Sequence, residues 1–246
     1  MSIDGPEDLA GLTRAARAVA RARDAMAAAV RPGVTTSELD RIGEAALRAA
    51  GARSGPRHAY DFPGATCVSV NDELAHGIPS GRVLREGDLV NVDVSCELDG
   101  YWADTGGSVP VGRVDPRAQA LLVATRAALD AAIARVRPGR PVAALGAAVE
   151  ACARRAGFSV VASLCGHGVG RFIHEPPSVP NTARGGDGER LEEGMVITVE
   201  PFLTMGGPRV VQDADGWTLR TADGAVGAQF EHTLVVGAGG ALVLTA

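Results

Sequence analysis

Four acidic side chains could together hold metal ions. They stand in separate short segments, namely VNVDVS with Asp93, GYWADT with Asp104, TVEP with Glu200 and QFEHT with Glu231. Like charges brought together raise one another's pKa and destabilise a fold unless cations neutralise them. Two divalent ions about 3.5–4 Å apart, bridged by carboxylates, would polarise a carbonyl group and lower the pKa of a water. The expected chemistry is therefore hydrolysis.

Histidines supply nitrogen for such a site. His167 lies between glycines in CGHGVGRFIHEPP, His174 follows in the same segment, and His76 stands in NDELAHGIPSG. A lone histidine beside Gly and Pro is more often a surface residue than a ligand, so the convergence with the acids is what favours a site. Ligands that are mostly carboxylate with one histidine suit Mn, Fe or Co, and Zn where it accepts oxygen ligands.

An internal repeat indicates how distant acids can meet. Residues 30–51, VRPGVTTSELDRIGEAALRAAG, correspond to residues 136–157, VRPGRPVAALGAAVEACARRAG, at an offset of 106. In both copies an alanine-rich stretch precedes Arg-Pro-Gly and a stretch with helical periodicity follows it, which predicts two helices joined by a turn. Thr36 or Ser37 is a suitable N-cap for the second helix of the first copy.

The repeat extends into strands. LREGDLVNVDV at 84–94 matches LEEGMVITVEP at 191–201, which places Asp93 opposite Glu200. Each segment has a Glu-Gly turn before a β-branched run, as is typical of a turn that leads into a strand.

A hairpin brings the second acid of the first half back. Asp99-Gly100 favours a tight turn that returns Asp104 alongside the first strand, and Glu231 takes the matching part in the second half. We therefore expect an α+β fold in a single domain, 1–246, whose halves span about 10–115 and 120–246 with a cleft between them.

Composition argues against several other classes of protein. The chain of 246 residues has a formal net charge of −5 and no long Lys/Arg run, so nucleic acid and membrane surfaces are not expected partners. No segment has transmembrane length, and the first residues lack the features of a secretory signal. The cysteines form no CxxC pair, which favours a reduced, cytoplasmic protein; they are Cys67, Cys96, Cys152 and Cys165.

Several motifs taken together resemble the methionine aminopeptidases of type I. They are HGIP at 76–79, VNVDVS at 90–95, GYWADT at 100–105, GHGVGRFIHEPP at 166–177, TVEP at 198–201 and QFEHT at 229–233. The resemblance implies the pita-bread fold, in which the helices of a pseudo-two-fold repeat pack on a curved antiparallel sheet. It also implies removal of the initiator methionine by a dinuclear metal centre with a bridging water. The expected partners are peptide and nascent-chain N-termini, with the ribosome as a candidate place of action, and the expected state is a monomer.

The resemblance implies a role for each acid and for one histidine. Asp93 would be a terminal ligand of one metal ion. Asp104 and Glu231 would bridge both ions, and His167 and Glu200 would complete the second. The ions would be two per chain, drawn from Co, Mn, Fe or Zn.

The resemblance also implies residues that act on the peptide. His76 and His174 would hydrogen-bond the substrate and stabilise the tetrahedral intermediate, while Glu200 would shuttle a proton to the leaving amine. A pocket for the methionine side chain would be formed by Tyr60, Phe62, Cys67 and Trp217.

The chain also departs from the family pattern. Trp102-Ala103 stands where the family commonly has His-Gly, Gly106-Gly107 follows Asp104, Ile173 replaces a common Phe, and the loop at 60–63 is one residue short. These changes bear on the side-chain pocket and so on the strictness of methionine preference.

Two alternatives share the fold. Prolidase or aminopeptidase P would share the metal residues, but they usually carry a large extra N-terminal domain. Members that have lost the metals serve as partner platforms, which fits poorly with five retained ligand positions.

Overall fold

The computed structural model describes residues 2–184 and 188–246. The helices are α1 (Pro6–Ala29), α2 (Thr36–Ala49), α3 (Gly55–Tyr60), α4 (Pro116–Ile133) and α5 (Ala143–Ala156). The strands before α4 are β1 (Arg53–Ser54), β2 (Cys67–Val70), β3 (Glu73–Ala75), β4 (Leu89–Leu98) and β5 (Tyr101–Pro110). Those after α5 are β6 (Ser159–Val160), β7 (Cys165–Gly168), β8 (Glu175–Pro180), β9 (Val196–Val199), β10 (Phe202–Thr204), β11 (Val210–Gln212), β12 (Leu219–Thr221), β13 (Gly227–Gln229), β14 (His232–Gly237) and β15 (Gly240–Val243).

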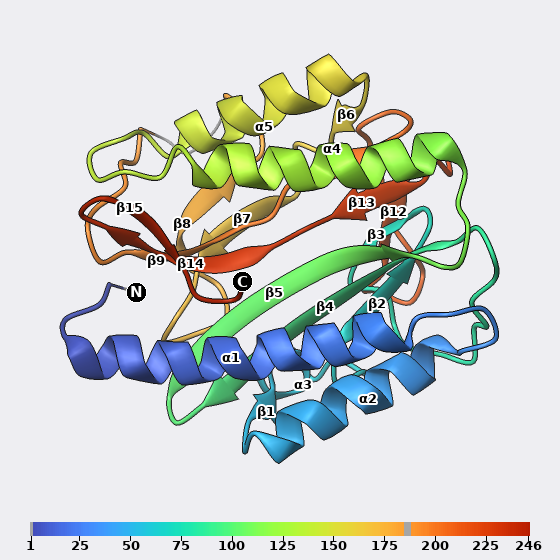
Figure 1. The fold of residues 1–246 in the computed structure, drawn as a ribbon, viewed down its shortest axis with the longest axis horizontal. Coiled ribbons are helices and arrows are strands. Elements are labelled where there is room, and N and C mark those ends of the chain that lie inside the picture. Colours follow the sequence, from blue (N-terminus) through green and yellow to red (C-terminus); the bar gives the residue numbers. More distant parts are fainter. Residues whose placement is uncertain (1, 185–187) are drawn as a thin grey trace.

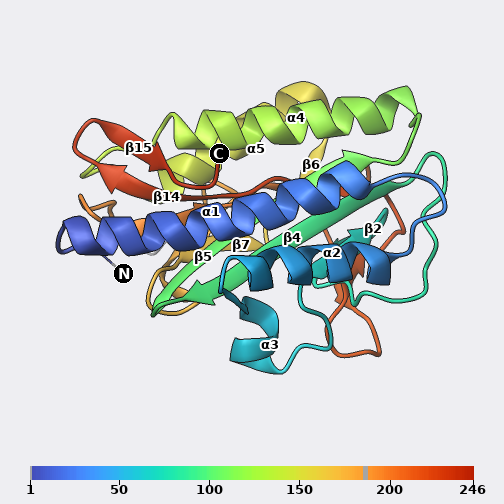
Figure 2. The same cartoon turned by 60° about the horizontal axis from the view of Figure 1, so that its bottom comes forward.

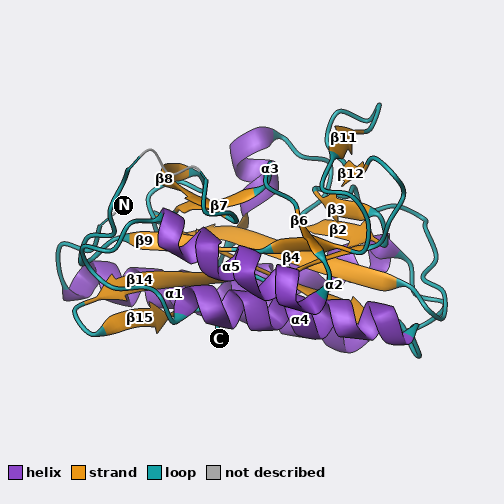
Figure 3. Cartoon of the chain, turned by 90° about the horizontal axis from the view of Figure 1, so that it is seen from above, coloured by secondary structure: helices purple, strands orange, loops and turns teal. Residues whose placement is uncertain are grey.

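Two helix pairs flank a layer of antiparallel strands. The α1–α2 pair and the α4–α5 pair lie on either side of the strands β5 and β14 in Figure 1, and α1 and α2 run beside β4 and β5 in Figure 2. Helices α1 and α4 follow one face of the strand layer, whereas α3 and the β11–β12 hairpin lie on the other face (Figure 3). In the described part of the chain, no helix is long and apolar enough to cross a membrane.

Equivalent hydrogen bonds in the two halves confirm the predicted repeat. The N–H of Gly33 donates to the carbonyl of Leu84 at 2.9 Å, and the N–H of Gly139 donates to the carbonyl of Leu191 at 2.7 Å. Both glycines have left-handed backbone angles, with φ of 91° and 78°. In each copy the inter-helix turn is thus hydrogen-bonded to the segment that leads into the strand of the same half.

The predicted hairpin joins β4 to β5. Asp99 and Gly100 have φ of 54° and 83°, as a two-residue turn with two positive φ angles requires. Ser95 is the register partner of Asp104, so the hairpin returns Asp104 alongside β4 as expected. The N-cap of α2, however, is Thr35 and not Thr36 or Ser37, because Thr35 and Glu38 form a capping box.

The halves are joined along β5. The hydroxyl of Thr105 donates to the carbonyl of Glu231 at 2.9 Å, and the N–H of Glu231 donates to the carbonyl of Gly106, also at 2.9 Å. Thr233 exchanges two hydrogen bonds with the backbone of Asp104. We call this contact between β5 and residues 229–233 the seam.

Each half has its own apolar core. In the first half Val19 and Leu39 from α1 and α2 pack with Val92 of β4. In the second half Leu121 and Leu145 from α4 and α5 pack with Ile197 of β9. The long helices therefore pack on one face of the strands, and the opposite face is free to form the site.

Candidate active site

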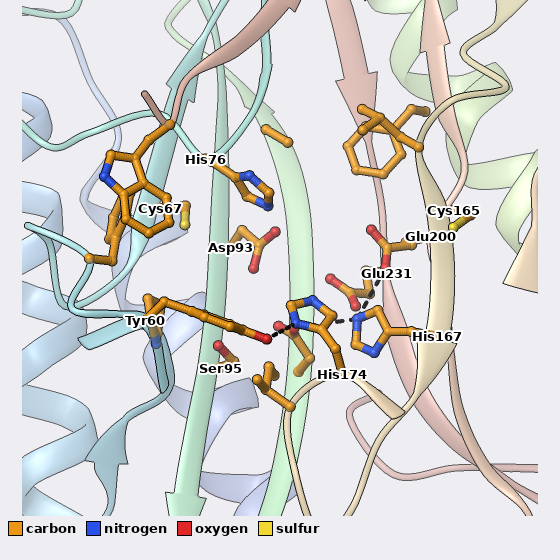
Figure 4. Close-up of a pocket in the computed structure, with 18 of the residues that line it drawn as sticks. Tyr60, Cys67, His76, Asp93, Ser95, Cys165, His167, His174, Glu200 and Glu231 are labelled. Carbon is orange, nitrogen blue, oxygen red and sulfur yellow. Dashed lines mark hydrogen bonds and ion pairs between the residues drawn. The ribbon is translucent and has the colours of Figure 1, made fainter. Parts of the chain in front are cut away.

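A cavity of about 450 Å³ opens on the strand face opposite α1 and α4. All the residues predicted to take part in metal binding, catalysis or substrate binding line it. Figure 4 shows the two sides of this cavity, with Tyr60, Cys67, His76 and Asp93 facing His167, Glu200 and Glu231. The fold thus brings together residues from both halves of the chain.

The acids come from the strands of the repeat. Asp93 lies in β4, where it pairs with Cys67 of β2, and Asp104 lies in the adjacent β5. Glu200 directly follows β9, and Glu231 lies between β13 and β14 on the seam. Asp104, Glu200 and Glu231 are all less than a tenth exposed.

His167 presents an unprotonated nitrogen to the acids. Its Nδ1 lies 2.9 Å from the carbonyl oxygen of Gly168, and because a carbonyl can only accept, Nδ1 carries the hydrogen. Its Nε2 lies 3.4 Å from Glu200 Oε1 and 4.0 Å from Asp104 Oδ2. A histidine whose tautomer is fixed by a backbone carbonyl is a common form of metal ligand.

The ionisable groups of the cluster have strongly shifted pKa values. Burial raises the pKa of Asp93, Glu200 and Glu231 well above their ordinary values, and neighbouring carboxylates raise them further. Burial likewise raises the pKa of Asp104 to about 6. Burial and then the nearby His174 lower the pKa of His167 to about 3. Each of these shifts favours the neutral form of its group. A bound cation would neutralise the carboxylates and so lower the pKa values of the four acids.

The residues present fit divalent metal. Asp104, His167 and Glu231 each offer a ligand atom, and these atoms lie within 4.8 Å of one another. Asp104 Oδ1 and Glu231 Oε1 are buried and have no hydrogen-bond partner among the described residues. Buried carboxylate oxygens without partners are costly unless a ligand satisfies them, and oxygen with imidazole nitrogen is a donor set that divalent ions accept.

Two side chains that support the acids were missed by the sequence analysis. The hydroxyl of Thr198 donates to Glu200 Oε1 at 3.1 Å and accepts the backbone N–H of His167 at 3.0 Å. The amide of Gln229 donates to Glu231 Oε2 at 3.1 Å. Both stand two residues before the acid that they contact. Because residues i and i+2 of a strand share a face, this spacing was the signal that could have found them.

His76 and His174 both line the cavity, and they come from different halves of the chain. His76 follows β3 and has φ of 55°, a left-handed angle that is uncommon for a non-glycine residue. His174 precedes β8, and its ring centroid lies 4.3 Å from that of His167. Both imidazoles can therefore reach a molecule held at the acids.

The residues predicted to form a side-chain pocket all line the cavity, and three of them lie close to a partner there. Phe62 and Trp217 meet edge to face with centroids 5.2 Å apart, and Cys67 is buried beside Asp93. Tyr60 instead hydrogen-bonds His174. The apolar wall also includes Ile173, one of the positions that depart from the family pattern, and residues that were not predicted, which are Ala75, Leu164 and Phe202.

The positions that depart from the family pattern have clear structural roles. Trp102 is buried and does not line the cavity; its ring stacks on His58 at 5.5 Å and packs against Phe172 at 5.3 Å. Gly106 leaves no room for a side chain, since an added Cβ would meet the Gln229 amide at 2.5 Å. Gly107 pairs with Phe230 across the seam.

Buried carboxyl groups and a neutral imidazole in one cavity fit the site of a metal-dependent hydrolase. The sequence pattern of metallopeptidase family M24 matches residues 10–238. The chain is 40% identical over 247 residues to a Bacillus subtilis protein named methionine aminopeptidase 2, with 100% of this chain and 99% of that protein covered. It is 43% identical to a Staphylococcus epidermidis methionine aminopeptidase, with 100% and 98% covered. The chain therefore belongs to metallopeptidase family M24 and, within that family, to the methionine aminopeptidases.

Solved structures agree. A methionine aminopeptidase from Thermotoga maritima superposes with a TM-score of 0.96 at 34% identity, and the match covers 100% of this chain and 99% of that one. Prolidase from Pyrococcus furiosus superposes with a TM-score of 0.79 at 23% identity, covering 99% of this chain and 65% of that one. The second likeness concerns the fold alone. Together the comparisons confirm the predicted α+β pita-bread fold and the resemblance found in the sequence.

Proposed function

We propose that this protein removes the initiator methionine from peptides and newly made proteins by means of two divalent metal ions. The observation that carries the proposal is the buried cluster at the cavity. There carboxyl groups from both halves meet a neutral imidazole, and two carboxylate oxygens have no partner within residues 2–184 and 188–246. Relatives named methionine aminopeptidase, 40% and 43% identical over the full chain, support the choice of substrate.

The cluster offers ligands for two ions. Asp104 and Glu231 would be shared, since their ligand atoms lie within 4.8 Å of each other and of that of His167, and each has a buried oxygen without a partner among the described residues. Asp93 would serve one ion, and His167 with Glu200 the other. Divalent ions such as Co, Mn, Fe or Zn held there would supply polarisation of the peptide carbonyl and a water of lowered pKa.

The side chains around the cluster would handle protons and the peptide. Glu200, held by the Thr198 hydroxyl at 3.1 Å, would take a proton from the attacking water and give it to the leaving amine. His76 and His174 would donate hydrogen bonds to the peptide oxygen as negative charge develops on it. The methionine side chain would enter the pocket of Phe62, Cys67 and Trp217, with Tyr60 at its rim.

The proposal extends to the whole protein. Residues 1–246 would form one catalytic domain whose halves, about 10–115 and 120–246, share the site along the seam. The protein would act in the cytoplasm as a monomer on peptide and nascent-chain N-termini, with the ribosome as a candidate place of action.

A substrate panel tests the proposed function. With Mn or Co present, the protein should release free methionine from Met-Ala-Ser and leave Ala-Pro and Gly-Pro uncut. Asp104→Ala or His167→Ala should reduce this release by at least about 100-fold, because loss of a ligand exceeds the effect of losing its supporting partner. Asp130→Ala, which removes an exposed carboxylate on α4, is the matched control and should stay near wild type.

Two results would contradict the proposal. Cleavage of the Xaa-Pro peptides with Met-Ala-Ser untouched would identify a prolidase-like specificity. Absence of any bound divalent metal after native purification, together with no cleavage of either class, would indicate a partner platform.

A further inference from the structure

The hydroxyl of Tyr60 makes a hydrogen bond inside the candidate active site that no assigned role explains. Tyr60 is the last residue of α3, and its Oη lies 2.5 Å from Nδ1 of His174. The two rings are 5.5 Å apart and tilted by 38°. Figure 4 shows the phenol reaching across the cavity to this nitrogen, while the other ring nitrogen of His174 lies toward the carboxylates.

A neutral imidazole carries hydrogen on one nitrogen and a lone pair on the other, so its two tautomers act differently. Hydrogen on Nε2 gives the cavity a donor for a peptide carbonyl, whereas hydrogen on Nδ1 would leave a lone pair facing the carbonyl oxygen. A phenol O–H that donates to Nδ1 selects the first form. No other hydrogen bond of the Tyr60 hydroxyl occurs among the described residues, which leaves its hydrogen for His174.

We propose that Tyr60 is a positioning residue for His174, which fixes the tautomer with hydrogen on Nε2 by donating a hydrogen bond to Nδ1. This inference rests on the proposed function, in which His174 donates to the substrate. It gives the tyrosine hydroxyl a task separate from lining the pocket for the methionine side chain.

An aromatic chain holds Tyr60 in place. Tyr60 is 40% exposed at the rim of the cavity, so its ring needs support. Phe172 meets it edge to face at 6.3 Å, and Trp102 packs against Phe172 from below at 5.3 Å. Trp102 also stacks on His58, two residues before Tyr60 in α3. Trp102, where the family commonly has histidine, is thus the buried residue that packs against Phe172 and His58 and so supports the position of Tyr60.

Nuclear magnetic resonance of the histidine ring nitrogens tests the tautomer directly. In the metal-free wild type at about pH 7.5, roughly one unit above the ordinary histidine pKa, His174 should be protonated on Nε2 alone. Tyr60→Phe removes only the hydroxyl and should convert His174 to a mixture of tautomers. Tyr101→Phe, which removes the hydroxyl that donates to Asp8 outside the cavity, should leave His174 unchanged. A His174→Ala sample assigns the resonances.

Kinetics with Met-Ala-Ser and the Mn-loaded enzyme provide the second readout. Tyr60→Phe should lower kcat about tenfold, as expected for loss of one well-formed hydrogen bond, with little change in KM. In a His174→Ala background the same change should alter kcat by less than about twofold, because its effect passes through His174. Tyr101→Phe should match wild type in both backgrounds.

Three outcomes have distinct meanings. An unchanged His174 tautomer in Tyr60→Phe would overturn the inference, and so would an equal loss of kcat in both backgrounds. If the wild type releases no methionine while Tyr60→Phe still shifts the tautomer, the proposed function fails and the positioning role stands.

Discussion

We expect Asp104→Asn to change the stability of the protein in opposite directions with and without metal. At pH values above about 6, where Asp104 is ionised, its buried Oδ1 has no described partner and faces other carboxyl groups. Asp104→Asn removes one of these charges, so the metal-free protein should melt higher. A gain of about 1 kcal/mol corresponds to about 2–4 °C for a chain of this size.

Calorimetry in EDTA and in excess Mn checks this prediction. In Mn the order should reverse, because Asp104→Asn would lose a proposed ligand while the wild type would gain the binding energy of the ion. Asp130→Asn on α4 should melt like wild type in both conditions. A metal-free Asp104→Asn that melts well below wild type would show that the carboxylate stabilises the fold without an ion.

Thr198 should matter for catalysis although it has no contact with substrate. Thr198→Val keeps the shape but removes the hydroxyl that orients Glu200 and the backbone of His167. We expect metal affinity or kcat to fall about 10–100-fold. Thr125→Val makes the same exchange at a fully buried threonine of α4 and should leave both unchanged. If Thr198→Val and Thr125→Val lowered metal affinity and kcat equally, Thr198 would have no role beyond packing.

At the scale of elements, the two inter-helix turns should respond alike to the same change. Gly33 and Gly139 both have positive φ and open space where a Cβ would stand. Alanine at either position should therefore cost only the backbone penalty, about 1–2 kcal/mol. Gly81→Ala, at a residue without a positive φ and with equal open space, should be near neutral. Urea unfolding measures all three, and a large difference between Gly33→Ala and Gly139→Ala would contradict equivalent roles for the turns.

The elements that carry the acids could be predicted because they are encoded locally. Arg-Pro-Gly turns, Glu-Gly turns and Asp99-Gly100 each leave a signal within a few residues, and the repeat doubles that signal. The N-cap at Thr35 was misplaced by one residue, although Thr35 and Glu38 have the spacing of a capping box. Helix boundaries are known from sequence to no better precision.

Contacts between distant segments could not be predicted in the same way. The seam joins Thr105 to Glu231, and the bond from Tyr60 to His174 spans 114 residues. Neither leaves a local pattern in the sequence. The repeat indicated that the acids would converge, but it carried no information on which hydroxyl or ring would orient each of them.

At the scale of the whole molecule, bound metal should stabilise the contact between the two halves. Each half contributes carboxylates to one cluster, so ions that bind there stabilise the folded chain over any state in which the seam has opened. At ion concentrations about 100-fold above Kd the gain is about 2.7 kcal/mol, or about 5–10 °C in Tm. Scanning calorimetry with and without EDTA should show this shift in one cooperative transition. Two separate transitions would contradict a single domain.

The seam also has an implication for the origin of the fold. Asp104 in β5 and Glu231 between β13 and β14 come from different halves of the repeat and meet at the seam. A half-length ancestor that carried one copy of this unit would therefore have held its ions only as a homodimer, with the site on the symmetry axis. Fusion of two copies would release each from that symmetry, and the halves could then acquire different side chains at the cluster, such as His167 in the second half.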